Sequence, residues 1–202
     1  MPNEVQIYNK ILQEFGDTLE NASKDTQNNQ YMTQCQKRIV NFDSFKEYVT
    51  TKLKLSGCPY SCDVLYRYCT NEWFLIEFKN GKLENENTNK GFVPKNNEFY
   101  DIIRKLLESL LLLTEELEQS IKFFRNNIIF ILVYNEQNNP FLNVMDSMIK
   151  LGHKSEPIPM SYLNEILPND KFNVSYFNKL YVKKTFVCSK EFFEKEFITK
   201  WT

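Results

Sequence analysis

Apolar residues recur at helical spacing in several parts of the chain. The clearest stripe runs from Glu98 to Leu117, where apolar positions step by three and four and predict an amphipathic helix. A similar stripe from Val5 to Leu19 predicts an opening helix. Asp43 is a plausible N-cap for a short helix that follows it.

Other apolar segments have the composition and length of β-strands. Cys62–Arg67 and Trp73–Gly81 are typical of two consecutive strands in a hairpin, and Ile128–Tyr134 is typical of a fully buried strand. Tyr181–Val187 predicts a late strand, after which Ser189 could cap a final helix. This order predicts a mixed α/β fold, a three-layer sandwich with a central mixed β-sheet flanked by helices.

The 202 residues fit one domain. We expect residues 1–42 to form a helical N-terminal extension and residues 43–135 to form the core. Polar segments at Asp25–Gln30 and Glu84–Gly91 predict loops, and residues 141–151 predict a further helix.

Composition narrows the range of functions. The formal net charge is −1, so no global basic field indicates nucleic-acid binding. Only 5 glycines are present, and neither a P-loop nor a dinucleotide-binding fingerprint occurs. The N-terminal residues lack the apolar core of a signal peptide, and no apolar run is long enough to cross a bilayer. We therefore expect a cytoplasmic protein that does not bind membranes.

The cysteines and the histidine do not indicate a metal site or a catalytic site. Cys58 and Cys62 are the only close pair among 5 cysteines, and no second pair or nearby histidine completes a zinc site. Reduced structural thiols are the better interpretation. His153, the single histidine, lies in a loop-like segment, where an exposed side chain is expected.

Three charged residues interrupt the apolar hairpin. The face of the sheet on which each one lies decides whether they can form one site. Asp63 lies on the first strand, and Glu77 and Lys79 share one face of the second. A three-residue loop at Cys69–Asn71 places Asp63 directly opposite Glu77, whereas one at Thr70–Glu72 places it opposite Lys79. A two- or four-residue loop turns Asp63 to the other face, unless a bulge corrects the phase.

Charged residues are almost never fully buried unless they are paired, so these three residues suggest a site. Asp63 and Glu77 at about 5 Å would repel each other without a cation between them. Mg²⁺ is commonly held by one or two carboxylates together with waters and phosphate oxygens, and Mn²⁺ could substitute for it. Lys79 could then orient or deprotonate the attacking water and offset charge in the transition state. These are the parts needed to hydrolyse a phosphodiester.

Asp63, followed fourteen residues later by Glu77-Phe78-Lys79, resembles the motif of the PD-(D/E)XK nuclease superfamily. The resemblance implies a restriction-endonuclease-like fold in which Asp63 and Glu77 bind the metal and Asp63, Glu77 and Lys79 are catalytic.

The similarity covers about residues 43–135. It assigns the helix after the motif to Glu98–Leu117 and the next strand to Ile128–Tyr134.

The sequence departs from the family pattern at three points. Cys62 rather than proline precedes Asp63, and no clear strand comes before Asp63 unless Thr50–Leu55 forms it. Many members place a further glutamate on the first helix. Three residues are candidates for it: Glu14, Glu20 and Glu47.

Three functions therefore remain open. The leading hypothesis is a Mg²⁺-dependent nuclease that cuts nucleic acid, most simply DNA. The main alternative is a catalytically inactive nuclease-fold binding module that acts through a protein partner, and a homodimer is possible in either case. The third is a structural domain in which Glu77 and Lys79 only pair with each other. Basic residues that could support a nucleic-acid surface are Lys52, Lys54, Lys79, Lys82, Lys90, Lys95, Arg104, Lys105, Lys183 and Lys184.

Overall fold

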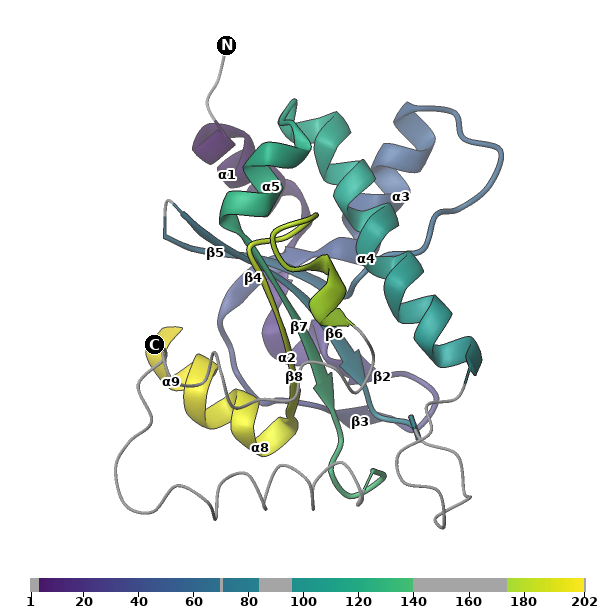
Figure 1. Cartoon of the computed structure of the whole chain (residues 1–202), viewed down its shortest axis with the longest axis vertical. Helices are drawn as coiled ribbons and strands as arrows, with labels where there is room; N and C mark the ends of the chain where they lie inside the picture. Colours follow the sequence, from purple (N-terminus) through teal and green to yellow (C-terminus); the bar gives the residue numbers. More distant parts are fainter. Residues whose placement is uncertain (1–3, 70, 84–95, 140–173, 202) are drawn as a thin grey trace.

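A single six-stranded sheet forms the centre of the molecule (Figure 1). The computed structural model describes residues 4–69, 71–83, 96–139 and 174–201. In this described part of the chain, the strands follow each other across the sheet in chain order, and two further strands form a separate hairpin. In that order they are β1 (Gly16–Thr18), β4 (Arg38–Asn41), β5 (Val64–Cys69), β6 (Glu72–Lys79), β7 (Ile128–Tyr134) and β8 (Lys184–Ser189).

The sheet has an antiparallel half and a parallel half. Neighbouring strands from β1 to β6 are antiparallel, whereas β6, β7 and β8 are parallel. The parallel strands therefore end together at one edge of the sheet, where sites in α/β folds are often built. The separate hairpin consists of β2 (Lys24–Asp25) and β3 (Gln30–Tyr31).

Helices cover both faces of the sheet. One face packs against α1 (Glu4–Phe15), α3 (Phe42–Lys52), α4 (Asn96–Leu117) and α5 (Ile121–Asn127) around a large apolar core. The other face packs against α2 (Leu19–Ala22) and a C-terminal helical segment made of α8 (Lys190–Phe193), a π-helical turn (Glu194–Ile198) and α9 (Thr199–Trp201). The predicted three-layer α/β sandwich is confirmed.

Several predicted elements are found where the sequence placed them. The buried strand Ile128–Tyr134 is β7, and the stripe that ends at Leu117 is α4. The late strand is β8, which begins at Lys184, and the Ser189 Oγ accepts a hydrogen bond from the Phe192 N–H at 3.2 Å, as a helix N-cap does.

Other expectations need correction in the N-terminal half. Residues 1–42, expected as a helical extension, supply strands β1 and β4 of the central sheet. The opening helix ends at Phe15, because Gly16 packs against the Leu12 carbonyl where a Cβ would clash. Leu19 then begins α2.

The segment around α3 also differs from expectation. Asn41, not Asp43, is the N-cap, since the Asn41 side chain accepts a hydrogen bond from the Ser44 N–H at 3.2 Å. Thr50–Leu55 is not a strand, because α3 continues to Lys52; the strand before Asp63 is β4. The predicted helix at 141–151, the loop at 84–91 and His153 lie outside the described residues.

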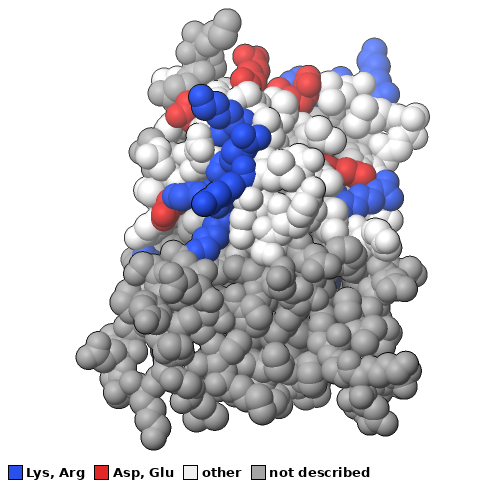
Figure 2. Space-filling view, in the orientation of Figure 1, with Lys and Arg blue, Asp and Glu red and all other residues white. Residues whose placement is uncertain are grey.

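Three further properties bear on function. In the described part of the chain, no helix combines the length and apolar character needed to cross a membrane. All five cysteines are free thiols, with Cys58 exposed and Cys62 buried. On the face seen in Figure 2, Lys and Arg side chains gather in a column over α5 and the segment before β8.

Candidate functional site

The register of the β5–β6 hairpin brings Asp63 and Glu77 together. Val64 pairs with Ile76, so the next position along the ladder places Asp63 opposite Glu77, and the Asp63 N–H donates to the Ile76 carbonyl at 3.0 Å. Near the turn, Cys69 pairs with Glu72 and the register shifts at a bulge after Arg67. The connection is thus shorter than three residues, and the bulge restores the phase that lets the two carboxylates share a face.

Glu77 is the most unusual residue of the site because its side chain is fully buried, with 0% exposure. Its Oε1 accepts a hydrogen bond from the Lys105 Nζ at 2.7 Å and lies 3.5 Å from the Lys79 Nζ. Its Oε2 has no hydrogen-bond partner among the described residues. Burial, reinforced by the nearby Asp63 carboxylate, raises the pKa of Glu77 to about 8.

Lys105 of α4 supplies the cation that joins the two acids. Its Nζ lies 2.7 Å from the Glu77 Oε1 and 3.6 Å from the Asp63 Oδ1. Burial alone would lower the pKa of Lys105, but the two carboxylates outweigh it and raise that pKa above its usual value. Lys105 is therefore held as an ammonium group between two acids.

Sequence reasoning placed Lys105 only among general basic residues. A signal for its role exists, because Lys105 follows the buried Ile102 by three positions and precedes the buried Ser109 by four. Two polar residues thus lie along the inner side of α4. The Ser109 Oγ accepts a hydrogen bond from the Cys62 N–H at 2.8 Å, which fixes the chain directly before Asp63.

Asp63 is held by the strand on which Glu77 lies. Its Oδ2 accepts a hydrogen bond from the Phe78 N–H at 2.6 Å, and its Oδ1 faces the Lys105 ammonium. Burial raises the pKa of Asp63, although Lys105 and the Phe78 N–H oppose the shift. Its geometry is therefore fixed from both β6 and α4.

A third acid near the site comes from α3. The Asp43 Oδ1 accepts hydrogen bonds from the Lys46 Nζ at 2.6 Å and the Ser61 Oγ at 2.8 Å. Burial works to raise the pKa of Asp43, but these two donors hold it below its usual value. Sequence reasoning treated this residue only as a cap.

The three glutamates proposed to join the site do not line its cavity. Glu14 lies 4.0 Å from Lys10, and Glu20 accepts a hydrogen bond from Gln36. Glu47 is exposed on α3. Asp43 takes the place expected for an acid on a preceding helix, because it alone of these four residues lines the cavity.

The site opens into a polar cavity of about 510 Å³ at the carboxyl end of β6. Asp43, Asp63, Lys79 and Lys105 line it from the sheet and the helices, and residues 22–28 line it from the end of α2 and the β2–β3 hairpin. Glu77, without exposed surface, is not part of the lining. A cavity of this volume is large enough for a small ligand or for one reacting group of a larger one.

A network of amide side chains holds the β2–β3 hairpin at this cavity. The Asn80 Nδ2 donates to the Asp25 Oδ2 at 2.8 Å and to the Gln30 Oε1 at 3.0 Å. The Asn135 Nδ2 in turn donates to the Asn80 Oδ1 at 2.7 Å. Because Asn80 directly follows β6, the hairpin is fixed to the strand that carries Glu77 and Lys79.

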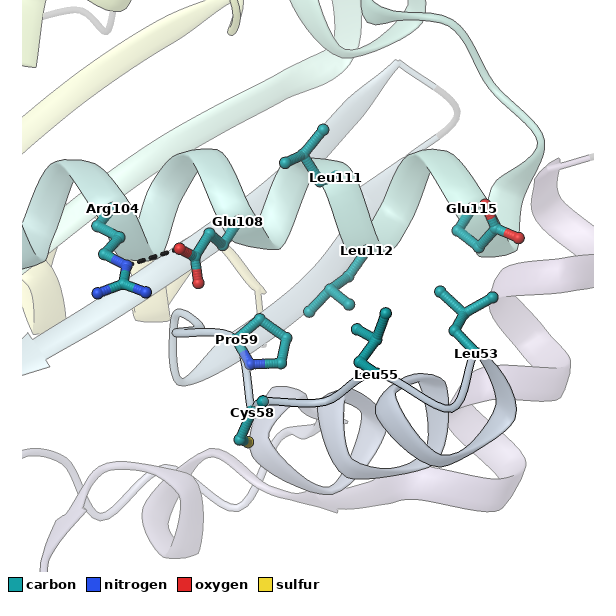
Figure 3. A pocket seen from close by; sticks show the side chains of 10 residues that line it. Leu53, Leu55, Cys58, Pro59, Arg104, Glu108, Leu111, Leu112 and Glu115 are labelled. Atoms are coloured by element: carbon teal, nitrogen blue, oxygen red, sulfur yellow. Dashed lines mark hydrogen bonds and ion pairs between the residues drawn. The ribbon is translucent and has the colours of Figure 1, made fainter.

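A second pocket of about 450 Å³ lies between α4 and the segment after α3 (Figure 3). Leu53, Leu55 and Leu112 line it. Of the three charged residues described in its lining, Arg104 and Glu108 bind each other, with 2.6 Å between the Arg104 Nε and the Glu108 Oε1, and Glu115 is the third. This pocket therefore presents mainly apolar surface, and the Asp63–Glu77 cavity remains the better candidate for chemistry.

The carboxylates at the site fit a hard divalent cation. Asp63 lines the cavity and Glu77 lies buried directly behind it, and the unpartnered Glu77 Oε2 is the kind of buried atom that such an ion would satisfy. In the described residues no group of three or more His, Cys, Asp or Glu is arranged to hold a metal. Two carboxylates are nevertheless a common number for Mg²⁺, whose other ligands are waters and phosphate oxygens.

Comparison of the chain with models of known protein families, with curated proteins and with solved structures finds no match.

Proposed function

We propose that the protein is a Mg²⁺-dependent nuclease that hydrolyses phosphodiester bonds, with DNA as the substrate. One observation carries this proposal: Asp63 and Glu77 face each other across β5 and β6 and share the Lys105 ammonium beside a polar cavity. The resemblance to the PD-(D/E)XK superfamily supports the same assignment. The five free cysteines support a cytoplasmic location.

Asp63 and Glu77 would hold the metal ion, and the bound ion would polarise the phosphoryl group and activate a water. The Phe78 N–H holds the Asp63 Oδ2, which leaves the Oδ1 for a cation. Lys79 lines the cavity with its side chain 21% exposed and its Nζ 3.5 Å from the Glu77 Oε1. That ammonium can orient a water or offset negative charge on the phosphate.

The lining of the cavity suits an anionic substrate. Besides Lys79 and Lys105, the side chains of Lys24 and Lys82 line it. Ammonium groups around carboxylates form an arrangement in which phosphate oxygens and a cation can be bound together. Before a metal ion binds, the Lys105 ammonium must leave the two carboxylates or share them.

The test is cleavage of plasmid and single-stranded DNA with and without Mg²⁺ or Mn²⁺. Cleavage should require the metal and should fall at least about 100-fold in Asp63→Asn, Glu77→Gln and Lys79→Met, because each removes a group that binds the metal or the developing charge. Glu47→Gln, which removes an exposed acid outside the cavity, is the matched control and should cleave like the wild type. Metal-independent cleavage, or equal activity in Glu77→Gln and the control, would contradict the proposal.

The alternative of an inactive binding module rests on one specific observation. Lys105 already pairs with Glu77 and lies near Asp63, so the charges are compensated without a metal. If isothermal titration detects no Mg²⁺ or Mn²⁺ binding to the wild type, the cluster is structural and a protein partner becomes the leading function.

A further inference from the structure

A strip of basic side chains lies over α5 and the segment before β8 (Figure 2). It consists of Lys122 and Arg125 of α5 together with Lys179, Lys183 and Lys184. Two contacts bring these segments together. The Arg125 Nε donates to the Leu180 carbonyl at 3.1 Å, and the Lys183 N–H donates to the carbonyl of Ile128, the first residue of β7, at 2.7 Å.

The charge of this strip is poorly compensated among the described residues. Only Lys183 has a carboxylate partner there, with its Nζ 3.6 Å from the Glu72 Oε1. The Lys184 Nζ lies 5.1 Å above the Phe186 ring, and burial without a described acid lowers the pKa of Lys184. Because the whole chain has a net charge of −1, this strip is a local accumulation of positive charge.

The polarity of the strip argues against a membrane surface as its ligand. Helices that bind membranes insert an apolar face, but the aromatic residues of α5 point inward. Phe124 is fully buried, and the Phe123 ring contacts the Trp73 ring with centroids 5.6 Å apart. The exposed Ile121, Tyr176 and Leu180 come from different elements rather than from one helix face, and the lysine and arginine groups instead fit the phosphates of a nucleic-acid strand.

We propose that the strip formed by Lys122, Arg125, Lys179, Lys183 and Lys184 binds the sugar–phosphate backbone of a nucleic acid. The choice of nucleic acid as the polyanion rests on the proposed nuclease function. The binding itself does not depend on catalysis.

The distance between the strip and the cavity sets a minimum ligand length. Trp73, beside the strip, and Lys79, at the cavity, are six residues apart on β6, which is about 20 Å of strand. In a B-form duplex each strand carries a phosphate about every 3.4 Å along the axis, so about six base pairs span the distance between the two regions. A 20-mer is therefore long enough to contact both regions, whereas a tetranucleotide makes fewer phosphate contacts and should bind more weakly.

The experiment measures binding of fluorescent single-stranded 4-mers and 20-mers by polarisation, in EDTA so that no cleavage occurs, over a series of salt concentrations. The strip variant is Lys122→Gln/Lys179→Gln/Lys184→Gln, which leaves Arg125 and Lys183 with their contacts. The control is Lys10→Gln/Lys195→Gln/Lys200→Gln, which removes the same charge elsewhere. Circular dichroism and thermal unfolding establish that both variants are folded.

For the 20-mer, we expect the strip variant to bind at least about tenfold more weakly than the control at low salt. The slope of log K against log salt should be smaller by about 2, because three phosphate contacts are lost. The 4-mer should bind far more weakly than the 20-mer. Equal affinity and slope in the two variants, or binding of the wild type only to phosphatidylserine vesicles, would overturn the proposal.

The proposed nuclease activity and the proposed binding by the strip can be disproved independently. Glu77→Gln should keep the salt-dependent binding of the wild type even though it loses cleavage. Loss of cleavage with intact strip binding would therefore count against the nuclease alone, and cleavage with equal binding in both lysine variants would count against the strip alone.

Discussion

The buried side chains on the two faces of β6 are stabilised in different ways. On one face, Phe74 packs against the ring of Trp201 with centroids 4.9 Å apart, and against Phe197 at 6.1 Å. On the other face, the equally buried Glu77 depends on the Lys105 ammonium at 2.7 Å. Apolar packing satisfies the first face at any pH, whereas the second depends on protonation and on a partner from another element. A fold that keeps such a group gives up stability for it, as functional sites often do.

The largest expected effect is on the aromatic face. Phe197 is 1% exposed and contacts the rings of Phe74, Phe186 and Trp201. Phe197→Ala should lower the free energy of unfolding by about 3–5 kcal/mol, because it removes a buried ring and leaves a cavity. Urea unfolding at pH 5 and pH 8 should give the same loss, and the control Phe197→Leu should lose much less. A loss of unfolding free energy that depends strongly on pH would contradict the difference between the two faces.

Lys105→Met on the charged face should have a smaller effect that depends on pH. At pH 8 we expect a loss of about 3 kcal/mol, at the low end for a broken buried pair because Lys105 keeps some exposure. At pH 5 the loss should shrink, since Glu77 can take up a proton instead of remaining a bare charge. Urea unfolding at the two pH values measures this, and Arg104→Met, on the exposed side of α4, is the control. An equal loss at both pH values would show that packing rather than charge is the contribution of Lys105.

A third effect, comparable in size with that of Lys105→Met, is the pH dependence of the wild type itself. The pKa of Glu77 is raised from 4.5 to about 8 in the folded protein, so folding favours the protonated form between these values. The resulting stabilisation is complete below about pH 4.5 and is lost as the pH rises through about 8. Unfolding free energy should fall by about 3 kcal/mol between pH 5 and pH 8.

Glu77→Gln should flatten this dependence, because the amide does not titrate. A residual decline with pH is expected from Asp63, whose pKa is also raised. Glu47→Gln should follow the wild-type curve. Parallel curves for Glu77→Gln and the wild type would show that Glu77 is already ionised across this range.

Sequence periodicity located the elements and the two opposing acids. Ile128–Tyr134 is apolar at every position, which only a strand covered on both faces requires, and its bounds matched β7. The sequence could place Asp63 opposite Glu77 only for one length of turn, and the observed shorter turn brings them together because a bulge follows Arg67. These features depend on residues close together in the chain.

The parts of the site that were missed depend on contacts between distant elements. Lys105 is 28 positions from Glu77 and reaches it only after α4 packs on the sheet. Asp43 reaches the cavity because β4, not a strand at Thr50–Leu55, precedes the hairpin in the sheet. Periodicity shows which side of α4 is buried, but it does not show which buried polar groups meet.

The order of strands in the sheet has a consequence for how the chain folds. The β5–β6 hairpin joins residues that are near in sequence, so it can form early, whereas the parallel pairings with β7 and β8 close long loops and form later. If the hairpin forms first, Asp63 comes to lie beside Glu77 before α4 packs and brings Lys105. At that stage only Lys79, of the same strand, would offset the two acids, and a proton on Glu77 would ease the step.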